Sequence, residues 1–197
     1  IKEYFANYAL YMSDVTIDMG RDETIVHHQR AEPWTVTLID TGSDSMTGGR
    51  LGRVREYIKD EEAFCFTYGD GVGDNDITAS VAFHRNHGKK ATMTTSYPPG
   101  RFGALKIVDG QVLSFEEKPK GDGSMVNAGF FVLSPDVLNL IISDYTVWEQ
   151  DPLRQLVNEG ELMAFRHEGF WQPMDTLADK NTLQAMWIEE KAPWKVW

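Results

Sequence analysis

The apolar run Phe64–Tyr68, which ends in Gly69-Asp70-Gly71, is the sequence feature that most constrains the fold. A short, continuous apolar run of this kind is typical of a buried strand in a parallel sheet. In open α/β sheets ligands bind beyond the carboxyl ends of the strands, and glycines there let a ligand approach the backbone closely. Asp70 is placed to hold a divalent cation that bridges phosphates. A tight Asp-Gly turn is the equally weighted alternative.

Helix and strand patterns alternate along much of the chain, which indicates an α/β fold with a mainly parallel or mixed sheet. A helical stripe opens the sequence at Ile1, Phe5 and Tyr8, and a helix closed by Gly88 is expected over 77–87. No linker or repeat is visible, so we expect one domain over 1–197. A loop that leads into a helix is expected over 45–58, and further helices over 134–142, 152–160 and 176–191. Strands are expected over 14–19, 24–29, 34–40, 64–68, 91–98, 111–119, 127–134 and 161–165.

Composition narrows the class of protein. The 197 residues are enough for a domain with a sizeable core. The net charge of −11 argues against a nucleic-acid partner, which would need a basic face, but not against a small anionic substrate. No stretch is long and apolar enough to suggest a membrane partner, and the single cysteine, Cys65, leaves no disulfide framework within the chain. These features favour a cytoplasmic location.

Three further clusters are candidates for chemistry. Asp175 follows a probable strand and an aromatic loop, where it is a second possible metal ligand, although Asp175 or Thr176 could simply cap the last helix. Glu117 and Lys118 lie in an acidic and basic cluster that could bind a sugar hydroxyl and a phosphate, or form a solvated turn. Gly48, Gly49 and Arg50 open a helix, where backbone N–H groups could meet an anion or a base, or where the loop could be merely flexible.

Taken together and in this order, the motifs resemble the sugar-1-phosphate nucleotidyltransferase family, in its cytidylyltransferase branch. The resemblance extends over essentially the whole chain, and the TGGRL and PPGRFGAL wording is specific to that branch. The motifs that carry it are EPWTVTLIDTG, TGGRL, FTYGDGV, PPGRFGAL, FEEKPKGDG, NAGFFVL, WEQDPL and GFWQPMD.

The resemblance implies a Rossmann-like nucleotidyltransferase fold with a central, mostly parallel mixed sheet. It implies transfer of CMP from CTP to α-D-glucose 1-phosphate, with Mg²⁺ as cofactor, giving CDP-glucose and pyrophosphate. CDP-glucose would feed dideoxysugar synthesis for surface polysaccharides, and the enzyme would be a homo-oligomer. The implied catalytic residues are Asp70, Lys118 and Asp175, of which Asp70 and Asp175 bind the metal. The implied substrate-binding residues are Gly48, Gly49, Arg50, Gly69, Gly103, Glu117, Asn127 and Gly129.

One part of the family pattern is absent from this sequence. The glycine-rich GGxGTR loop, which the resemblance places before Ile1, supplies donors and cations to the triphosphate, and two strands of the sheet accompany it. We therefore expect the 197-residue chain alone to be inactive and to lack those strands. Two alternatives stay open: a nucleotide-sugar-dependent glycosyltransferase that uses an Asp-x-Asp pair, for which Asp74 and Asp76 are candidates, and a non-catalytic sugar-phosphate-binding module.

Overall fold

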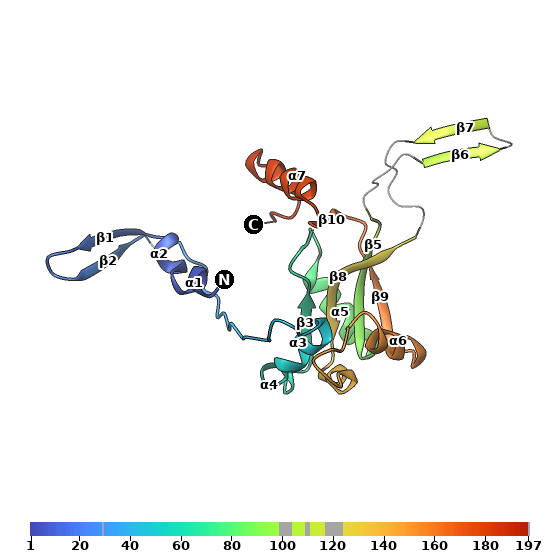
Figure 1. Ribbon diagram of the computed structural model, residues 1–197, viewed down its shortest axis with the longest axis horizontal. Helices are drawn as coiled ribbons and strands as arrows, with labels where there is room; N and C mark the ends of the chain where they lie inside the picture. Colours follow the sequence, from blue (N-terminus) through green and yellow to red (C-terminus); the bar gives the residue numbers. More distant parts are fainter. Residues whose placement is uncertain (29, 99–103, 109–110, 117–123, 197) are drawn as a thin grey trace. The chain divides into compact units, whose positions relative to one another are not determined.

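The computed structural model describes residues 1–28, 30–98, 104–108, 111–116 and 124–196 (Figure 1). The chain divides into two compact units, Ile1–Thr41 and Gly42–Trp197. The presence of one catalytic domain over 1–197 stays a prediction. No helix in the described ranges is long and apolar enough to span a bilayer.

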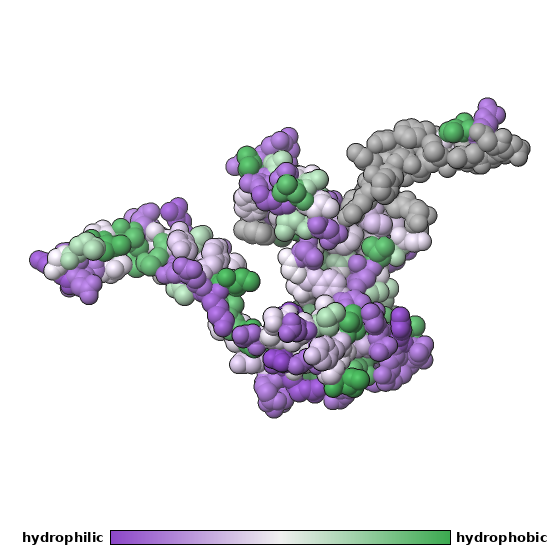
Figure 2. All heavy atoms as spheres, viewed as in Figure 1, coloured by the Kyte–Doolittle hydropathy of each residue, from purple (hydrophilic) through white to green (hydrophobic). Residues whose placement is uncertain are grey.

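The first unit contains two short helices and a hairpin. The expected opening helix is interrupted at Asn7, so that it forms α1 (Lys2–Ala6) and α2 (Tyr8–Tyr11). Strands β1 (Asp14–Asp18) and β2 (Glu23–His27) lie where strands are expected, and they pair antiparallel. Their apolar side chains are exposed, and Figure 2 shows hydrophobic residues along this hairpin.

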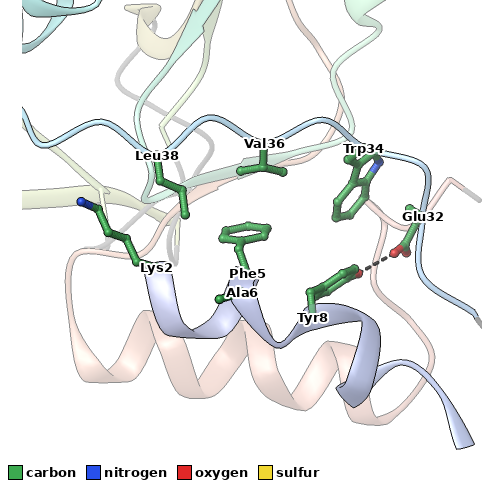
Figure 3. Close-up of a pocket in the computed structure, with 8 residues that line it drawn as sticks. All are labelled: Lys2, Phe5, Ala6, Tyr8, Glu32, Trp34, Val36 and Leu38. Atoms are coloured by element: carbon green, nitrogen blue, oxygen red, sulfur yellow. Dashed lines mark hydrogen bonds between the residues drawn. The ribbon is translucent and has the colours of Figure 1, made fainter. Parts of the chain in front are cut away.

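The prediction of a strand over 34–40 is wrong, because these residues form neither a helix nor a strand. Its alternating side chains do share a face, but that face lines a pocket of about 360 Å³ with α1 and Tyr8 (Figure 3). Trp34 stacks on Tyr8 at 5.8 Å between ring centroids, and the Tyr8 hydroxyl donates to Glu32 Oε2 at 2.5 Å. The alternation of apolar side chains over 34–40 therefore marks a face that packs toward a helix, not a strand that pairs within a sheet.

A four-stranded sheet organises the second unit. Its order is β3 (Phe64–Thr67), β8 (Val126–Leu133), β5 (Ala91–Ser96) and β9 (Leu162–Arg166), drawn side by side in Figure 1. β8 is antiparallel to both of its neighbours, and β5 is parallel to β9. Three strands thus run one way and β8 runs the other, which confirms the mixed α/β sheet.

The expectation for the strand before Asp70 needs a correction. β3 is not a fully buried parallel strand: it lies at the edge of this sheet, pairs antiparallel with β8 and alternates between half-buried and exposed residues. Phe64 and Phe66 face the core, whereas Cys65 and Thr67 are exposed. A short apolar run does not distinguish a buried central strand from a half-exposed edge strand, because residues such as Cys65 and Thr67 are compatible with both.

Two further pairs of strands complete the sheets. β4 (Gly71–Gly73) pairs antiparallel with β10 (Trp171–Pro173), directly after Asp70 in one chain segment and before Asp175 in the other. β6 (Ala104–Val108) pairs antiparallel with β7 (Gln111–Glu116). The β4–β10 pair is the one that positions candidate site residues.

The helices of the second unit follow their sequence signals. In α5 (Ile77–His87), Asp76 caps the N-terminus and Gly88, with φ 63°, ends the helix as predicted. Ser134 and Pro135 do begin a helix, but it is a 3₁₀ helix, η1 (Pro135–Leu140). The remaining helices are α3 (Thr47–Arg53), α4 (Arg55–Ile58), α6 (Asp151–Asn158) and α7 (Leu177–Ile188).

The core lies between the sheet, α3, η1 and α6. Trp148 is fully buried there and contacts Phe66 and Phe131 edge-on, with ring centroids 6.1 and 5.9 Å apart. The buried members of this core are Leu51, Ala91, Phe131, Leu133, Val137, Leu138, Trp148 and Leu156.

Helix α3 packs closely on the 144–146 segment. The N–H of Gly49 donates to Thr146 O at 3.1 Å, and a Cβ on Gly49 would lie 2.0 Å from Asp144 O. Arg53 donates to both Asp144 carboxylate oxygens, at 2.9 and 2.6 Å, which lowers the pKa of Asp144. Because Gly49 has no side chain, the backbone of α3 can approach the backbone of the 144–146 segment closely.

A buried polar relay joins α5 to β5. Thr92 Oγ1 lies 2.9 Å from His84 Nδ1 and 2.7 Å from His87 Nε2, and the Lys89 N–H donates to His87 Nδ1 at 2.9 Å. Since Nδ1 of His87 accepts, Nε2 carries the proton and donates to Thr92, whose hydroxyl can then donate to His84. The relay needs both imidazoles neutral.

We expect Gly49→Ala to destabilise the protein by about 1–3 kcal/mol or more, because the methyl group overlaps backbone atoms that cannot rotate away. This outweighs the roughly 1 kcal/mol that alanine gains over glycine inside a helix. Gly69→Ala is the matched control, since a Cβ there meets nothing within 4 Å. Urea melts of both variants measure the difference; equal stabilities would contradict the close packing of α3.

We expect stability to fall as pH drops from about 7 to 5. Burial is the main cause that lowers the pKa of both His84 and His87; their neighbours His87 and Lys89, respectively, add to it, while Glu62 and Glu161 oppose it. The unfolded chain therefore binds more protons below its ordinary histidine pKa of about 6.5, and stability present above that pH is lost below it. His87→Gln should flatten this slope and His28→Gln, at an exposed site, should not; chemical denaturation at several pH values measures both.

Candidate active site

A pocket of about 380 Å³ opens where α3 meets the carboxyl end of β3. It brings together three residues that the sequence singles out, Arg50, Gly69 and Asp70. Because β3, β5 and β9 run in the same direction, this is also the edge at which open α/β sheets bind ligands. Its lining residues are Thr47, Arg50, Phe66, Thr67, Tyr68, Gly69, Asp70 and Glu149.

Asp70 and Asp175 lie on neighbouring backbone segments. β4 and β10 pair with Gly71 opposite Pro173, and the Met174 N–H donates to Asp70 O at 2.8 Å. β4 begins directly after Asp70, and β10 ends two residues before Asp175. Two aspartates that are 105 positions apart in the sequence thus lie on neighbouring backbone segments.

The alternative role for Asp175, as the cap of the last helix, does not apply. The cap of α7 is Thr176, whose hydroxyl accepts from the Asp179 N–H at 3.1 Å, and the Asp179 carboxylate accepts from the Thr176 N–H at 3.0 Å. This reciprocal capping box satisfies the start of the helix. Asp175 stands outside it, immediately before the cap.

The donor set at this place fits a magnesium ion. Mg²⁺ is commonly bound by one or two carboxylates, with waters and substrate phosphates completing the octahedron. Within the described ranges, no group of three or more His, Cys, Asp or Glu side chains forms a dedicated metal cage. Carboxylates of the kind that Mg²⁺ prefers thus stand on two neighbouring backbone segments, and the role of Asp70 and Asp175 as metal ligands stays a prediction.

The pocket also contains residues that sequence reasoning missed. Glu149 accepts hydrogen bonds from Thr47 Oγ1, at 2.7 Å, and from the Tyr68 hydroxyl. Burial, and then the bond to Glu149, raise the pKa of Tyr68 above its ordinary range. The WEQDPL wording contains Glu149, but its pattern gives no sign that the carboxylate reaches the end of β3.

The NAG motif forms an irregularity in β8. Met93 pairs with Phe131 and Thr95 pairs with Asn127, so β8 advances by four residues between these pairs while β5 advances by two. Gly129 has φ 79°, and a Cβ there would lie 2.7 Å from the Tyr68 ring. Asn127 turns toward the pocket: its Nδ2 donates to the Tyr68 hydroxyl at 3.3 Å, while its Oδ1 accepts from the Gly129 N–H at 2.8 Å.

The TGGRL motif serves both packing and the pocket. Gly48 and Gly49 are buried against the 144–146 segment, and the Gly49 N–H is already used by Thr146 O. Their substrate-binding role stays a prediction, beside this packing role. Arg50 lines the pocket and donates to Ser43 O at 3.2 Å.

The remaining predicted site residues are Gly103, Glu117 and Lys118, which lie outside the described residues. Asp74 and Asp76, the candidate Asp-x-Asp pair, have structural partners. Asp76 caps α5, and Asp74 Oδ1 accepts from the Phe170 N–H at 2.7 Å and lies 3.0 Å from His167 Nε2.

Comparison with known proteins gives close relatives. The chain is 66% identical over 197 residues to a glucose-1-phosphate cytidylyltransferase from Salmonella typhi, covering all of this chain and 77% of that one. It is 31% identical over 145 residues to the catalytic subunit beta of mannose-1-phosphate guanylyltransferase from Dictyostelium discoideum, covering 71% of this chain and 40% of the relative.

Solved structures share the fold. A glucose-1-phosphate thymidylyltransferase structure from Bacillus anthracis has a TM-score of 0.57 at 18% identity, over 74% of this chain and 62% of that one. HddC from Yersinia pseudotuberculosis has a TM-score of 0.53 at 20% identity, over 71% and 61%. The chain thus matches less than two thirds of either structure. The family model for nucleotidyl transferases matches residues 50–179, and the chain belongs to this family, in the branch of the glucose-1-phosphate cytidylyltransferases.

Proposed function

We propose that this protein transfers CMP from CTP to α-D-glucose 1-phosphate, giving CDP-glucose and pyrophosphate. The observation that carries the proposal is the pocket that joins Arg50 of TGGRL to Asp70 of YGDGV at the carboxyl edge of the sheet. It occurs in a chain that is 66% identical along its whole length to a protein named for this activity.

The proposed reaction is an in-line displacement. A phosphate oxygen of glucose 1-phosphate attacks the α-phosphorus of CTP; the new O–P bond forms as the bond to the bridging oxygen breaks, and pyrophosphate leaves with that oxygen. Asp70 and Asp175 hold Mg²⁺, which when bound neutralises phosphate charge. Arg50 contacts the nucleotide with its guanidinium group. The protein contributes by alignment and charge rather than through a covalent intermediate.

The sugar phosphate is expected to bind beside the NAG irregularity. Asn127 lies at the pocket end of β8 with its amide orientation fixed by Gly129, so it can offer a defined donor to a sugar hydroxyl. Lys118 is assigned to the phosphate and Glu117 to a sugar hydroxyl, with Gly103 lining the same side. Gly48, Gly49, Gly69 and Gly129 let substrates or neighbouring backbone approach closely.

The wider setting is part of the same proposal. CDP-glucose would be consumed in dideoxysugar synthesis for surface polysaccharides, in the cytoplasm, by enzymes that modify the activated sugar. The net charge of −11 suits small substrates whose phosphates are met by a metal and local cations, and disfavours nucleic acid. We also propose that the enzyme is a homo-oligomer.

The two alternatives are less well supported. A glycosyltransferase would need Asp74 and Asp76 as its ligand pair, but one caps α5 and the other holds the 167–170 turn. A sugar-phosphate-binding module without catalysis would bind glucose 1-phosphate and not CTP. Calorimetry with each substrate separates the binding module from the transferase.

We expect Asp70→Asn and Asp175→Asn each to reduce magnesium-dependent CDP-glucose formation by about 100-fold or more in a form that carries the GGxGTR segment, because a metal ligand contributes on the order of several kcal/mol to the transition state. The helix cap at Asp76 gives the control: Asp76→Ala should lose about 1 kcal/mol of stability and keep its turnover. Product formation is followed by coupled pyrophosphate release. Normal turnover in either asparagine variant would remove these residues from the metal site.

We expect Lys118→Ala to raise the KM for glucose 1-phosphate by about 10-fold or more while changing CTP binding little, because the proposed function assigns this cation to the sugar phosphate. Lys120→Ala, two positions away, serves as the matched control with a small effect on both substrates. Initial rates over a matrix of both substrate concentrations measure the two KM values. Equal effects of both changes on both substrates would mean that the lysines act only by general electrostatic attraction of anionic substrates.

A further inference from the structure

A continuous chain of hydrogen bonds crosses the pocket and joins four segments that are distant in sequence. The Trp148 N–H donates to Thr47 Oγ1 at 3.0 Å, and the Thr47 hydroxyl donates to Glu149 Oε2 at 2.7 Å. On the other side, Asn127 Nδ2 donates to the Tyr68 hydroxyl at 3.3 Å, and that hydroxyl donates to Glu149 Oε1. The two series of hydrogen bonds therefore meet at the carboxylate of Glu149.

The direction of these bonds specifies the residue at position 149. Each hydroxyl already accepts one hydrogen bond, from the Trp148 N–H or from Asn127, so its own proton is available for Glu149. Only a group that accepts at both ends satisfies both hydroxyls, and an ionised carboxylate does so. A glutamine would accept at one end and present an N–H group to the other hydroxyl.

The two oxygens of the Glu149 carboxylate bind side chains from two segments that line the pocket: the start of α3, here called the Arg50 wall, and the segment after β3, here called the Asp70 wall. Thr47 begins α3 and precedes Arg50 by three residues, which is nearly one helical turn. Tyr68 follows β3 and precedes Asp70 by two residues. Glu149 itself follows the buried Trp148 in the chain, so it is held from the core rather than from either wall.

We propose that Glu149 is a positioning residue for nucleotidyl transfer: its carboxylate sets the Arg50 wall and the Asp70 wall at a fixed separation. The inference rests on the proposed function, in which Arg50 meets the nucleotide and Asp70 holds the metal. Alignment within the pocket then depends on a group that contacts neither reacting atom. A displacement of about 1 Å between such walls can lower the rate about 100-fold.

The first test compares Glu149→Gln and Glu149→Ala with Asp151→Asn, a neighbouring acid that is exposed and outside the pocket. We expect kcat to fall about 10-fold in Glu149→Gln and about 100-fold in Glu149→Ala, with smaller changes in both KM values. The partial rescue by glutamine follows from its one remaining acceptor. Turnover is measured per active site, well below the melting temperature. Changes confined to KM, or equal losses in the control, would overturn the proposal.

The second test is a double-mutant cycle between Thr47→Val and Tyr68→Phe, run with Glu149 present and in Glu149→Ala. If the carboxylate connects the walls, the two effects on kcat are non-additive with Glu149 and additive without it. Additivity in both backgrounds would overturn the proposal.

A ligand-free measurement separates this idea from the proposed function. With ¹³Cζ-labelled tyrosine, Thr47→Val should move the Tyr68 resonance when Glu149 is present and leave it unmoved in Glu149→Ala. An unmoved resonance in both backgrounds overturns the coupling. A wild-type protein that makes no CDP-glucose even when it carries the GGxGTR segment overturns the proposed function, and the resonance still decides whether Glu149 couples the walls.

Discussion

The burial of the Trp148 side chain is the interaction on which the pocket depends. The indole is fully enclosed and contacts Phe66 and Phe131 edge-on. Emptying such a site costs about 3–5 kcal/mol, so the position of the backbone at 148 is strongly determined. Its N–H then reaches Thr47, and the next side chain, Glu149, extends into the pocket. Core packing therefore sets the geometry of a polar site.

The second constraint is the left-handed backbone at Gly129. The extra residues that β8 inserts opposite β5 interrupt the ladder and turn Asn127 toward the Tyr68 hydroxyl. A side chain at 129 would meet both the positive φ and the Tyr68 ring. Bulges redirect side chains at the expense of ladder regularity, and they occur often beside active sites. The short NAG motif is thus explained by backbone geometry as well as by its asparagine.

Local signals predicted the parts of the fold that local chemistry decides. α5 spans 77–87 and ends at Gly88 as expected, and the mixed α/β sheet is present. The errors arise where a pattern is compatible with two partners. The alternating residues over 34–40 pack toward a helix instead of joining a strand, and β3 lies at a sheet edge. The residue pattern of a segment shows which of its faces is apolar. Which element packs against that face depends on contacts that are distant in sequence.

The acidic residues show the same division within the candidate site. The sequence has 30 Asp and Glu residues, and their type alone does not separate metal ligands from caps. Hydrogen bonds identify three residues with structural roles: Asp76 and Asp179 cap helices, and Asp74 holds a turn. Glu149 was missed because its partners Thr47 and Tyr68 are 102 and 81 positions away, and only the fold brings them together. A carboxylate's role here follows from which donors reach it.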